Sequence, residues 1–451
     1  MATRKKKRSG TLPIIHEHAA GIDVGHDCHY VCVGSDPESD VRRFGSFTGD
    51  LEALGDWLAE RKVTTVAMES TGVYWIPLFE LLARRSFEVI LVDPRQTSRR
   101  NRPKTDVLDC QWIQRLHAHG LLSGSFRPGD DICVLRSYLR ERVMVTKNAS
   151  RCIQQMQKAL DQMNVKLHLV VSDITGKTGL SILEAILGGE RDPMKLAELR
   201  DYRCKNSREI IAKALVGNWR DEHLFALKQA LARWKFQMTQ IDQCDRELRQ
   251  WLKSMPKKFS WKKPVKTKSK QGARHARKNH PSDFAIRELL AALAGVDVTA
   301  IEGIDETIAL TLIAEIGVDL SAFPDERHFA AWLSLAPNPK KSGRHLRRSK
   351  TNQSANRAAT ALRLAAQAVS RSDSALGGFY RRLRARIGAP KAITATAHKI
   401  ARIFYRMLTK GAEYVAQGLE DYERQFREKT KRSLQRRAFE LGYHLVPAKC
   451  T

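Results

Sequence analysis

The chain has 451 residues, with 78 Lys and Arg against 49 Asp and Glu, and a formal net charge of +29. So large a positive excess predicts a polyanionic partner, nucleic acid above all. With 42% apolar residues the chain can form two or three folded domains, which excludes disorder over most of its length. No apolar run approaches the roughly 18 residues that span a bilayer, and the basic N-terminus lacks the apolar segment of a secretory signal. We therefore expect a soluble intracellular protein without a membrane partner.

Charge is distributed unevenly along the chain. Residues 19–131 hold 17 acidic and 13 basic residues, a net charge of −4, whereas residues 257–278 hold ten basic residues and no acid. A second basic cluster spans residues 340–350. An acidic module flanked by basic segments suggests a metal-dependent catalytic unit carried by nucleic-acid-binding segments. The eight cysteines form no CxxC pair, which argues against structural zinc.

The first part of the chain is predicted to alternate strands and helices. Strands are expected over residues 21–35, 41–47, 63–70 and 87–93, where β-branched and other apolar residues gather. Helices are expected after Asp50 as the capping residue, over residues 73–85, and from Thr105 to Gly120. The order β-β-α-β-α-β-α predicts a mixed α/β layer fold for residues 19–131, after a basic tail at 1–18.

The rest of the chain is predicted to be mostly helical. Across residues 132–255 apolar residues recur three and four apart, which is typical of a long coiled-coil-like arm. A basic linker or nucleic-acid arm follows at 256–284, then a helical domain at 285–415 and a basic helical tail at 416–451.

Two segments of the last domain carry more specific expectations. Residues 301–317 are either half of a helix-hairpin-helix, whose Gly turn presents N–H groups to phosphate, or an ordinary helix with Gly caps. Residues 338–350 are expected to form a loop rich in Gly and cations, followed by a helix over 356–369.

Four carboxylates occupy positions suited to metal chemistry. Asp23 lies in the first expected strand, Glu69 ends a later one, and Asp106 and Asp109 share one helix face. Strand-end acids and a helical DxxD can converge on two divalent ions about 4 Å apart, which assist phosphoryl displacement. A lone DxxD is usually a pair of solvated acids, but all four acids on suitable elements favour a site.

Four segments together resemble one known family. They are GIDVGHDCHYVCV, AMESTGVYW, VILVDPRQTSRRNRPKTDVLDCQWI and LAPNPKKSGR. They are similar to the DEDD transposases of a large insertion-sequence family, also known as bridge-RNA-guided recombinases. The resemblance implies a RuvC-like (RNase H-like) domain at 19–131, a helical coiled-coil region, and a mostly helical C-terminal transposase domain at 285–415.

The resemblance also implies an activity and its partners. The protein would excise and insert its element through a covalent phosphoserine link to DNA, with Mg²⁺, or Mn²⁺ in its place, held by Asp23, Glu69, Asp106 and Asp109. Its partners would be donor and target DNA, a noncoding guide RNA from the element, and further copies of itself in a dimer or tetramer. Metal site and serine would come from different protomers, and the protein would work at the bacterial nucleoid in the cytoplasm.

The resemblance identifies Ser342 as the nucleophile, by its match to the family's Ser-Gly-Gly loop. Here Arg344 replaces the second glycine. On chemistry alone Ser342 is an ordinary hydroxyl in a basic loop, with Ser349 and Ser354 as rivals, while Ser334 is expected to be buried in its helix. Cations near the acids and near the serine are expected to contact nucleic acid: Arg99, Arg100, Arg102, Lys104, Lys340, Lys341, Arg344, Arg347 and Arg348.

Two other interpretations stay open from the residues. A RuvC-like endonuclease or resolvase would hydrolyse DNA with the four acids alone, and Ser342 would be dispensable. A non-catalytic nucleic-acid-binding protein would keep the acids as structural groups. The placement of the acids argues against the second interpretation, and the large C-terminal half argues against the first.

Overall fold

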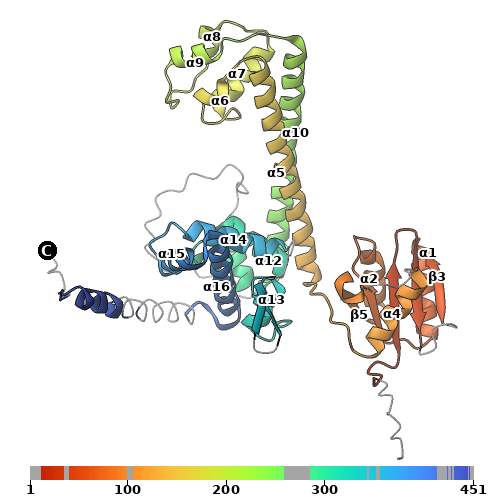
Figure 1. The fold of residues 1–451 in the computed structure, drawn as a ribbon. Coiled ribbons are helices and arrows are strands. Elements are labelled where there is room, and N and C mark those ends of the chain that lie inside the picture. Colours follow the sequence, from red (N-terminus) through yellow and green to blue (C-terminus); the bar gives the residue numbers. More distant parts are fainter. Residues whose placement is uncertain are drawn as a thin grey trace, which may run out of the picture. The chain divides into compact units, whose positions relative to one another are not determined.

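The computed structural model describes residues 12–34, 40–98, 105–257, 285–342, 345–351, 356–413 and 431–444, with 424, 428 and 446. Of residues 340–350 it describes the backbone alone. The chain divides into two compact units, Met1–Arg127 and Pro128–Thr451 (Figure 1).

The first unit is built on a five-stranded sheet. Its strands are β1 (Ala19–Val24), β2 (Cys28–Val33), β3 (Val41–Gly45), β4 (Thr65–Glu69) and β5 (Glu88–Val92), in the order β3-β2-β1-β4-β5. β1, β4 and β5 run parallel to one another, while β2 pairs antiparallel with β1 and β3. The mixed sheet confirms the predicted α/β class for this part of the chain.

The expected single strand over residues 21–35 is wrong, because it folds into the hairpin of β1 and β2. The N–H of Gly25 donates to the carbonyl of Cys28 at 3.1 Å and closes a tight turn. Gly, His and Asp are turn-compatible residues, and the apolar residues on both sides obscured this turn.

Helices cover both faces of the sheet. α1 (Thr48–Glu60) and α2 (Trp75–Arg84) bury their apolar side chains in the larger core, which joins Ile22 and Met68 to Leu54 and Leu82. α4 (Asp106–Ala118) packs on the other face, where Ile113 meets Ala67, and a short helix, α3 (Pro94–Thr97), precedes it.

Helix α1 begins two residues before the predicted cap. Asp50 lies inside the first turn, and its carboxylate accepts the N–H of Phe47 at 3.2 Å. The acid satisfies a backbone donor at the helix start, but from the third helical position rather than from the cap.

Two long helices dominate the second unit. α5 (Asp130–Gln162) and α10 (Asp221–Ser254) lie side by side (Figure 1). At the rise of an α-helix, each is about 50 Å long. Their cross-contacts run in opposite directions along the two helices, so the pair, here named the arm, is antiparallel: Asp131 with Trp251, Arg142 with Asp245, and Gln155 with Arg233.

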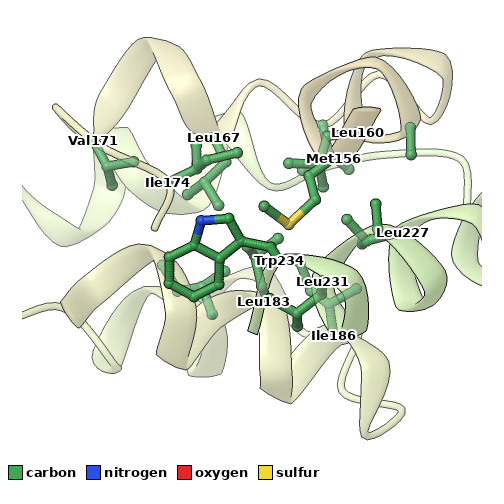
Figure 2. Close-up of a cluster of buried hydrophobic side chains, with 14 of the residues drawn as sticks. Met156, Leu160, Leu167, Val171, Ile174, Leu183, Ile186, Leu227, Leu231 and Trp234 are labelled. Atoms are coloured by element: carbon green, nitrogen blue, oxygen red, sulfur yellow. The ribbon is translucent and has the colours of Figure 1, made fainter. Parts of the chain in front are cut away.

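A small helical cluster closes one end of the arm. It comprises α6 (Leu167–Val170), α7 (Lys177–Leu187), α8 (Pro193–Glu198) and α9 (Arg208–Ala214). Trp234 of α10 lies beside Leu183 and Met156 in a continuous apolar core (Figure 2). This core fixes the tip of the arm to both long helices.

The other end of the arm joins the C-terminal helices through α12 (Glu306–Ile316). Arg136 donates to the carbonyl of Glu315 at 2.7 Å, and Arg140 donates to both carboxylate oxygens of Glu315 at 3.0 and 2.7 Å. Glu315 is 8% exposed, so these charge-assisted bonds tie α5 to the end of α12.

The remaining C-terminal elements are α11 (Ile286–Ala294), a 3-10 turn η1 (Val298–Ala300), α13 (Glu326–Trp332), β6 (Asn338–Ser342), β7 (His345–Lys350), α14 (Arg357–Val369), α15 (Ala375–Ile387) and α16 (Ala389–Lys410). Of these, α11, η1 and α14 pack against α12, while α13, α14 and α15 pack against α16. Among the described residues, no helix is long and apolar enough to cross a membrane.

The loop expected at residues 338–350 is wrong, whereas both interpretations of residues 301–317 stay open. Residues 338–342 and 345–350 form the antiparallel strands β6 and β7 rather than a loop. A two-stranded ribbon can form without an apolar alternation because its strands satisfy each other's backbone groups. Gly303 has φ of +84°, and a Cβ there would lie 2.5 Å from the carbonyl oxygen of Ala365 in α14. Close packing on α14 therefore accounts for this glycine.

We expect Arg142→Leu to lower the free energy of unfolding of the second unit by about 3–5 kcal/mol, because it leaves Asp245 charged and unpaired inside the arm. Both residues are 5% exposed, and the guanidinium donates to both carboxylate oxygens. Urea unfolding measures the change. Lys235→Ala, which breaks an exposed pair with Glu184, is the control and should cost less than about 1 kcal/mol. Equal losses in the two variants would contradict a structural role for the buried pair.

Candidate active site

Two of the four acids stand next to each other at one edge of the sheet. The parallel register pairs Ile22 of β1 with Met68 of β4, so Asp23 and Glu69 follow at neighbouring positions, on strands about 4.8 Å apart. Ile22 and Met68 point into the larger core, and side chains alternate along a strand. Asp23 and Glu69 therefore share the opposite face, the one that α4 covers.

Helix α4 approaches β1 more closely than a side chain would allow. A Cβ on Gly21 would lie 2.2 Å from the backbone nitrogen of Gln114 and 2.6 Å from the carbonyl oxygen of Cys110. Glycine at this position thus lets helix and strand touch backbone to backbone.

The ends of β1 and β4, where Asp23 and Glu69 lie, are here named the acidic edge. The direction of α4 brings its first turn to this acidic edge. His117, near its end, meets the hydroxyl of Thr65 at 2.9 Å, where β4 begins. From His117 back to Asp109 the helix advances about 12 Å, and from Thr65 to Glu69 the strand advances about 13 Å. Asp109 consequently lies over the end of the strands, half-buried, with the exposed Asp106 one turn away.

The pKa of the Cys110 thiol is raised by its surroundings. Burial raises its pKa to about 12, and the nearby Cys32 and the carboxylates of Asp23 and Asp109 add to the shift. Cys110 of α4 thus lies close to acids from both β1 and α4, as the strand register also requires.

The carboxylate of Glu69 is held on both sides by threonines. Thr71 donates to Oε1 and Thr97 donates to Oε2, each at 2.8 Å. Thr97 is 8% exposed and belongs to α3, whose cap Asp93 accepts the N–H of Arg95 at 2.8 Å. Sequence reasoning missed both threonines; the Asp-Pro start of a helical turn was the available signal for α3.

The four acids share an edge without forming a closed ligand sphere. Within the described residues, no group of three or more His, Cys, Asp or Glu side chains is close enough to hold a metal ion. Carboxylate oxygens are nevertheless the donors that hard divalent cations prefer. The residues at this edge therefore fit such an ion by chemistry, and their side chains would have to draw together around it.

Ser342 is the last residue of β6 and pairs with His345 of β7. The same register sets Lys340 opposite Arg348 and Lys341 opposite Leu346. Several residues predicted to contact nucleic acid lie outside the described residues: Arg99, Arg100, Arg102, Lys104 and Arg344. The alternative nucleophile Ser354 also lies outside them.

The other two serines have clear positions. Ser349 is in β7 opposite Pro339. Ser334 is not buried in a helix as predicted: it follows α13 with φ of +55° and is half-buried. A left-handed residue ends the helix and turns the chain toward β6.

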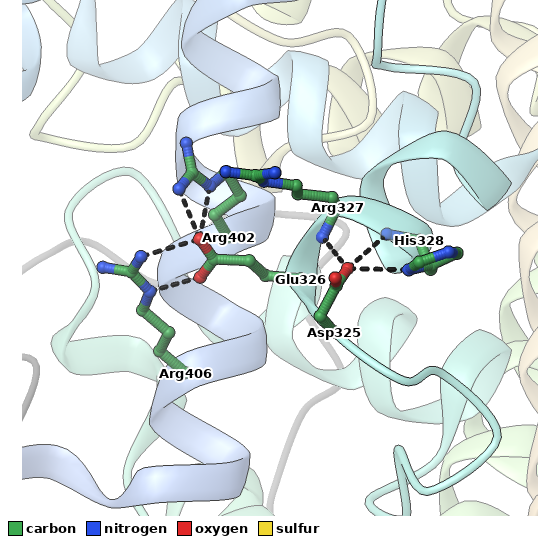
Figure 3. A network of polar contacts seen from close by, with 6 residues as sticks. All are labelled: Asp325, Glu326, Arg327, His328, Arg402 and Arg406. Atoms are coloured by element: carbon green, nitrogen blue, oxygen red, sulfur yellow. Dashed lines mark hydrogen bonds and ion pairs between the residues drawn. The ribbon is translucent and has the colours of Figure 1, made fainter.

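The strands β6 and β7, which carry Ser342, are here named the serine hairpin. A network of ion pairs and hydrogen bonds holds α13, the helix that precedes it (Figure 3). Arg402 and Arg406, one turn apart on α16, both donate to the carboxylate of Glu326. The adjacent Asp325 caps the helix by accepting the N–H groups of Arg327 at 2.7 Å and His328 at 2.8 Å. The start of α13 is thereby tied to the longest C-terminal helix.

Two family models match the chain. Residues 20–165 match DEDD_Tnp_IS110, described as a transposase, and residues 297–381 match the model described as Transposase IS116/IS110/IS902 family. Together they cover half of the chain and include the acidic edge and the serine hairpin. The chain belongs to the IS110 family of transposases. A comparison with curated proteins found no match.

Membership defines the chemistry in general terms. The transposase is an enzyme that cleaves and rejoins DNA, and DNA is its substrate. A transposase domain of the DEDD type uses a divalent metal ion. The carboxylates at the ends of β1 and β4 and at the start of α4 are of the chemical type that such an ion prefers.

We expect Thr97→Val to weaken divalent-metal binding by the transposase about tenfold or more, because the variant keeps the volume but loses the bond that orients Glu69. Calorimetric titration of the full chain with Mn²⁺ measures this. Thr97→Ser keeps the hydroxyl and should bind like the parent. Tight binding by the valine variant would show that Thr97 does not orient a metal ligand.

Proposed function

We propose that this transposase excises and inserts its element through a covalent phosphoserine link between Ser342 and DNA, with a divalent ion held by Asp23, Glu69, Asp106 and Asp109. The observation that carries the proposal is the gathering of these acids at one edge of the sheet, on β1, β4 and the first turn of α4. The placement of four acids from three elements at one end of the sheet supports a common function for them.

In the proposed reaction the serine oxygen attacks the scissile phosphorus. The Oγ–P bond forms, the bond from phosphorus to one deoxyribose oxygen breaks, the serine loses its proton and the leaving oxygen gains one. Attack by a hydroxyl of the other DNA end reverses these changes and releases Ser342. Each step exchanges one phosphodiester for another, so cutting and joining require no external energy source.

Residues of this chain have separable parts in that reaction. The four carboxylates would hold Mg²⁺ or, in its place, Mn²⁺, and Thr71 and Thr97 would orient Glu69. When bound, the ion supplies activation of the attacking oxygen and stabilisation of charge on the leaving one. Lys340, Lys341, Arg344, Arg347 and Arg348 neighbour the serine in sequence and would neutralise the DNA phosphates.

We infer further that an element-encoded noncoding RNA selects donor and target DNA, and that the transposase acts as a homo-oligomer, a dimer or a tetramer, in the bacterial cytoplasm. The resemblance to bridge-RNA-guided recombinases supports this, as does the basic run at 257–278.

The decisive experiment incubates the transposase with Mg²⁺, RNA transcribed from the element's flank and labelled DNA carrying the element junction. We expect a protein–DNA adduct that survives denaturation and maps to Ser342. Ser342→Ala and Asp106→Ala should each lower its yield at least a hundredfold, chelation by EDTA should abolish it, and Ser349→Ala should leave it unchanged.

Cut DNA without an adduct would instead indicate hydrolysis at the acids alone, and the RuvC-like endonuclease function would replace the proposed one. An adduct that persists in Ser342→Ala and disappears in Ser349→Ala would show that Ser349 is the nucleophile.

Mixing two inactive variants tests the oligomer. If acids and serine of one centre come from different protomers, a mixture of Ser342→Ala and Asp106→Ala proteins should regain about a quarter to a half of the parent's adduct yield, on the assumption of random assembly. The double variant Ser342→Ala/Asp106→Ala mixed with either single variant is the control and should stay inactive. Failure of the complementary mixture to recover would place both groups of a centre in one protomer.

A further inference from the structure

The tip of the arm carries an exposed aromatic ring that the transposase chemistry does not use. Tyr202 lies in the tip loop, defined as residues 199–207 between α8 and α9, and it is 86% exposed. The core beneath is closed by apolar residues, with Trp234 of α10 among them (Figure 2). The tip loop falls in neither family-matched segment, since these end at residue 165 and resume at residue 297.

Internal hydrogen bonds hold the tip loop in one conformation. Arg200 turns inward and donates to the carbonyl of Asn206 at 2.8 Å. The side chain of Asn206 donates to the carbonyl of Val170 at 2.7 Å, and the N–H of Asp201 donates to the hydroxyl of Thr178 at 2.9 Å. The ring of Tyr202 is therefore presented outward by a preorganised backbone, whereas a floppy loop would first have to be ordered.

Cations are fixed around the ring. The guanidinium of Arg203 lies 5.5 Å from the centre of the Tyr202 ring, and its Nε donates to Asp201 at 3.0 Å. Lys177 of α7 reaches the other oxygen of Asp201, also at 3.0 Å. Hydrogen bonds from Arg203 and then from Lys177 hold the pKa of Asp201 well below its usual range. This acid is therefore charged and pairs with both cations beside the ring.

The charge of the loop matches a polyanion. The tip loop contains three basic residues and one acid, Arg208 follows at the start of α9, and the acid is already paired with Arg203 and Lys177. Lys205 and Arg208 are exposed beside them. A flat ring with fixed cations at its side offers a base a stacking surface and offers the adjoining phosphates a counter-charge.

We propose that the tip loop binds an unpaired strand of nucleic acid, with a base stacked on Tyr202 and the flanking phosphates on Arg203, Lys177 and Lys205. A duplex satisfies the loop poorly, because its bases already stack on each other and present only edges and backbone. Both RNA and DNA single strands carry the required chemistry, and the two are separated by experiment.

The test uses the full-length protein, because other basic segments also bind nucleic acid and a total affinity would not isolate the loop. Fifteen-nucleotide strands of uridine RNA and thymidine DNA, each with one photoreactive thio-substituted base, are crosslinked by light, and the attached peptides are mapped by mass spectrometry. We expect crosslinks at Tyr202 or an adjoining residue of the tip loop, competed by unlabelled single strands and not by a duplex of equal length. Crosslinking by one strand type alone identifies the natural ligand as RNA or as DNA.

Matched variants give the size of the effect. Tyr202→Ala should reduce crosslinking in the tip loop about fivefold or more, the loss expected for one stacked base, and Tyr202→Trp should retain it. Phe225→Ala removes another exposed ring, 65% exposed on α10, and should change nothing. Thermal unfolding of all variants should match that of the parent, because neither ring is buried.

Three outcomes would overturn the proposal: crosslinks only outside the tip loop, equal competition by duplex and single strand, or equal yields from Tyr202→Ala and Phe225→Ala. Loss of the DNA adduct at Ser342 would not bear on it, since the crosslink requires no catalysis.

Discussion

Contact between β1 and α4 at Gly21 is the constraint on which the acidic edge depends. Because Gly21 has no side chain, the helix backbone rests directly on the strand. The anchor at His117 then sets how far the helix reaches, and its first turn arrives at the ends of β1 and β4. A larger residue at Gly21 would lift Asp106 and Asp109 away from Asp23 without touching any of these acids. The placement of the four acids thus depends on a residue that carries no functional group.

Charged contacts join the helices of the second unit at three places. Arg142 with Asp245 joins the two arm helices, Glu315 ties the arm to α12, and Glu326 ties α13 to α16. Each pair binds the guanidinium through two or more hydrogen bonds, a geometry that fixes relative rotation as well as distance. The charged contacts therefore give register to a part of the protein that is built almost entirely of helices.

Much of the fold follows from local signals in the chain. The strand β4 is an apolar run that ends at Glu69, β5 is an apolar run followed by Asp93, and Thr105 marks the start of α4 as its capping residue. The acids could therefore be assigned to their elements from the residue pattern alone. The β1–β2 turn could not be predicted, because apolar residues continue on both sides of it. The strands β6 and β7 could not be predicted either, because their residues show no apolar alternation. The grip of Thr97 on Glu69 also escaped, since it joins residues 28 positions apart and exists only once the chain has folded.

The arm sets a length scale for anything that touches both of its ends. From Asp131, beside the C-terminal helices, to Leu160, in the core of the tip, α5 rises about 44 Å. That equals the rise of about 13 base pairs of B-form DNA, more than one full helical turn. A nucleic acid bound at both ends of the arm would have its two binding points separated by this distance. A transposase of this family with a shorter arm would then require a correspondingly shorter distance between the two bound points of the nucleic acid.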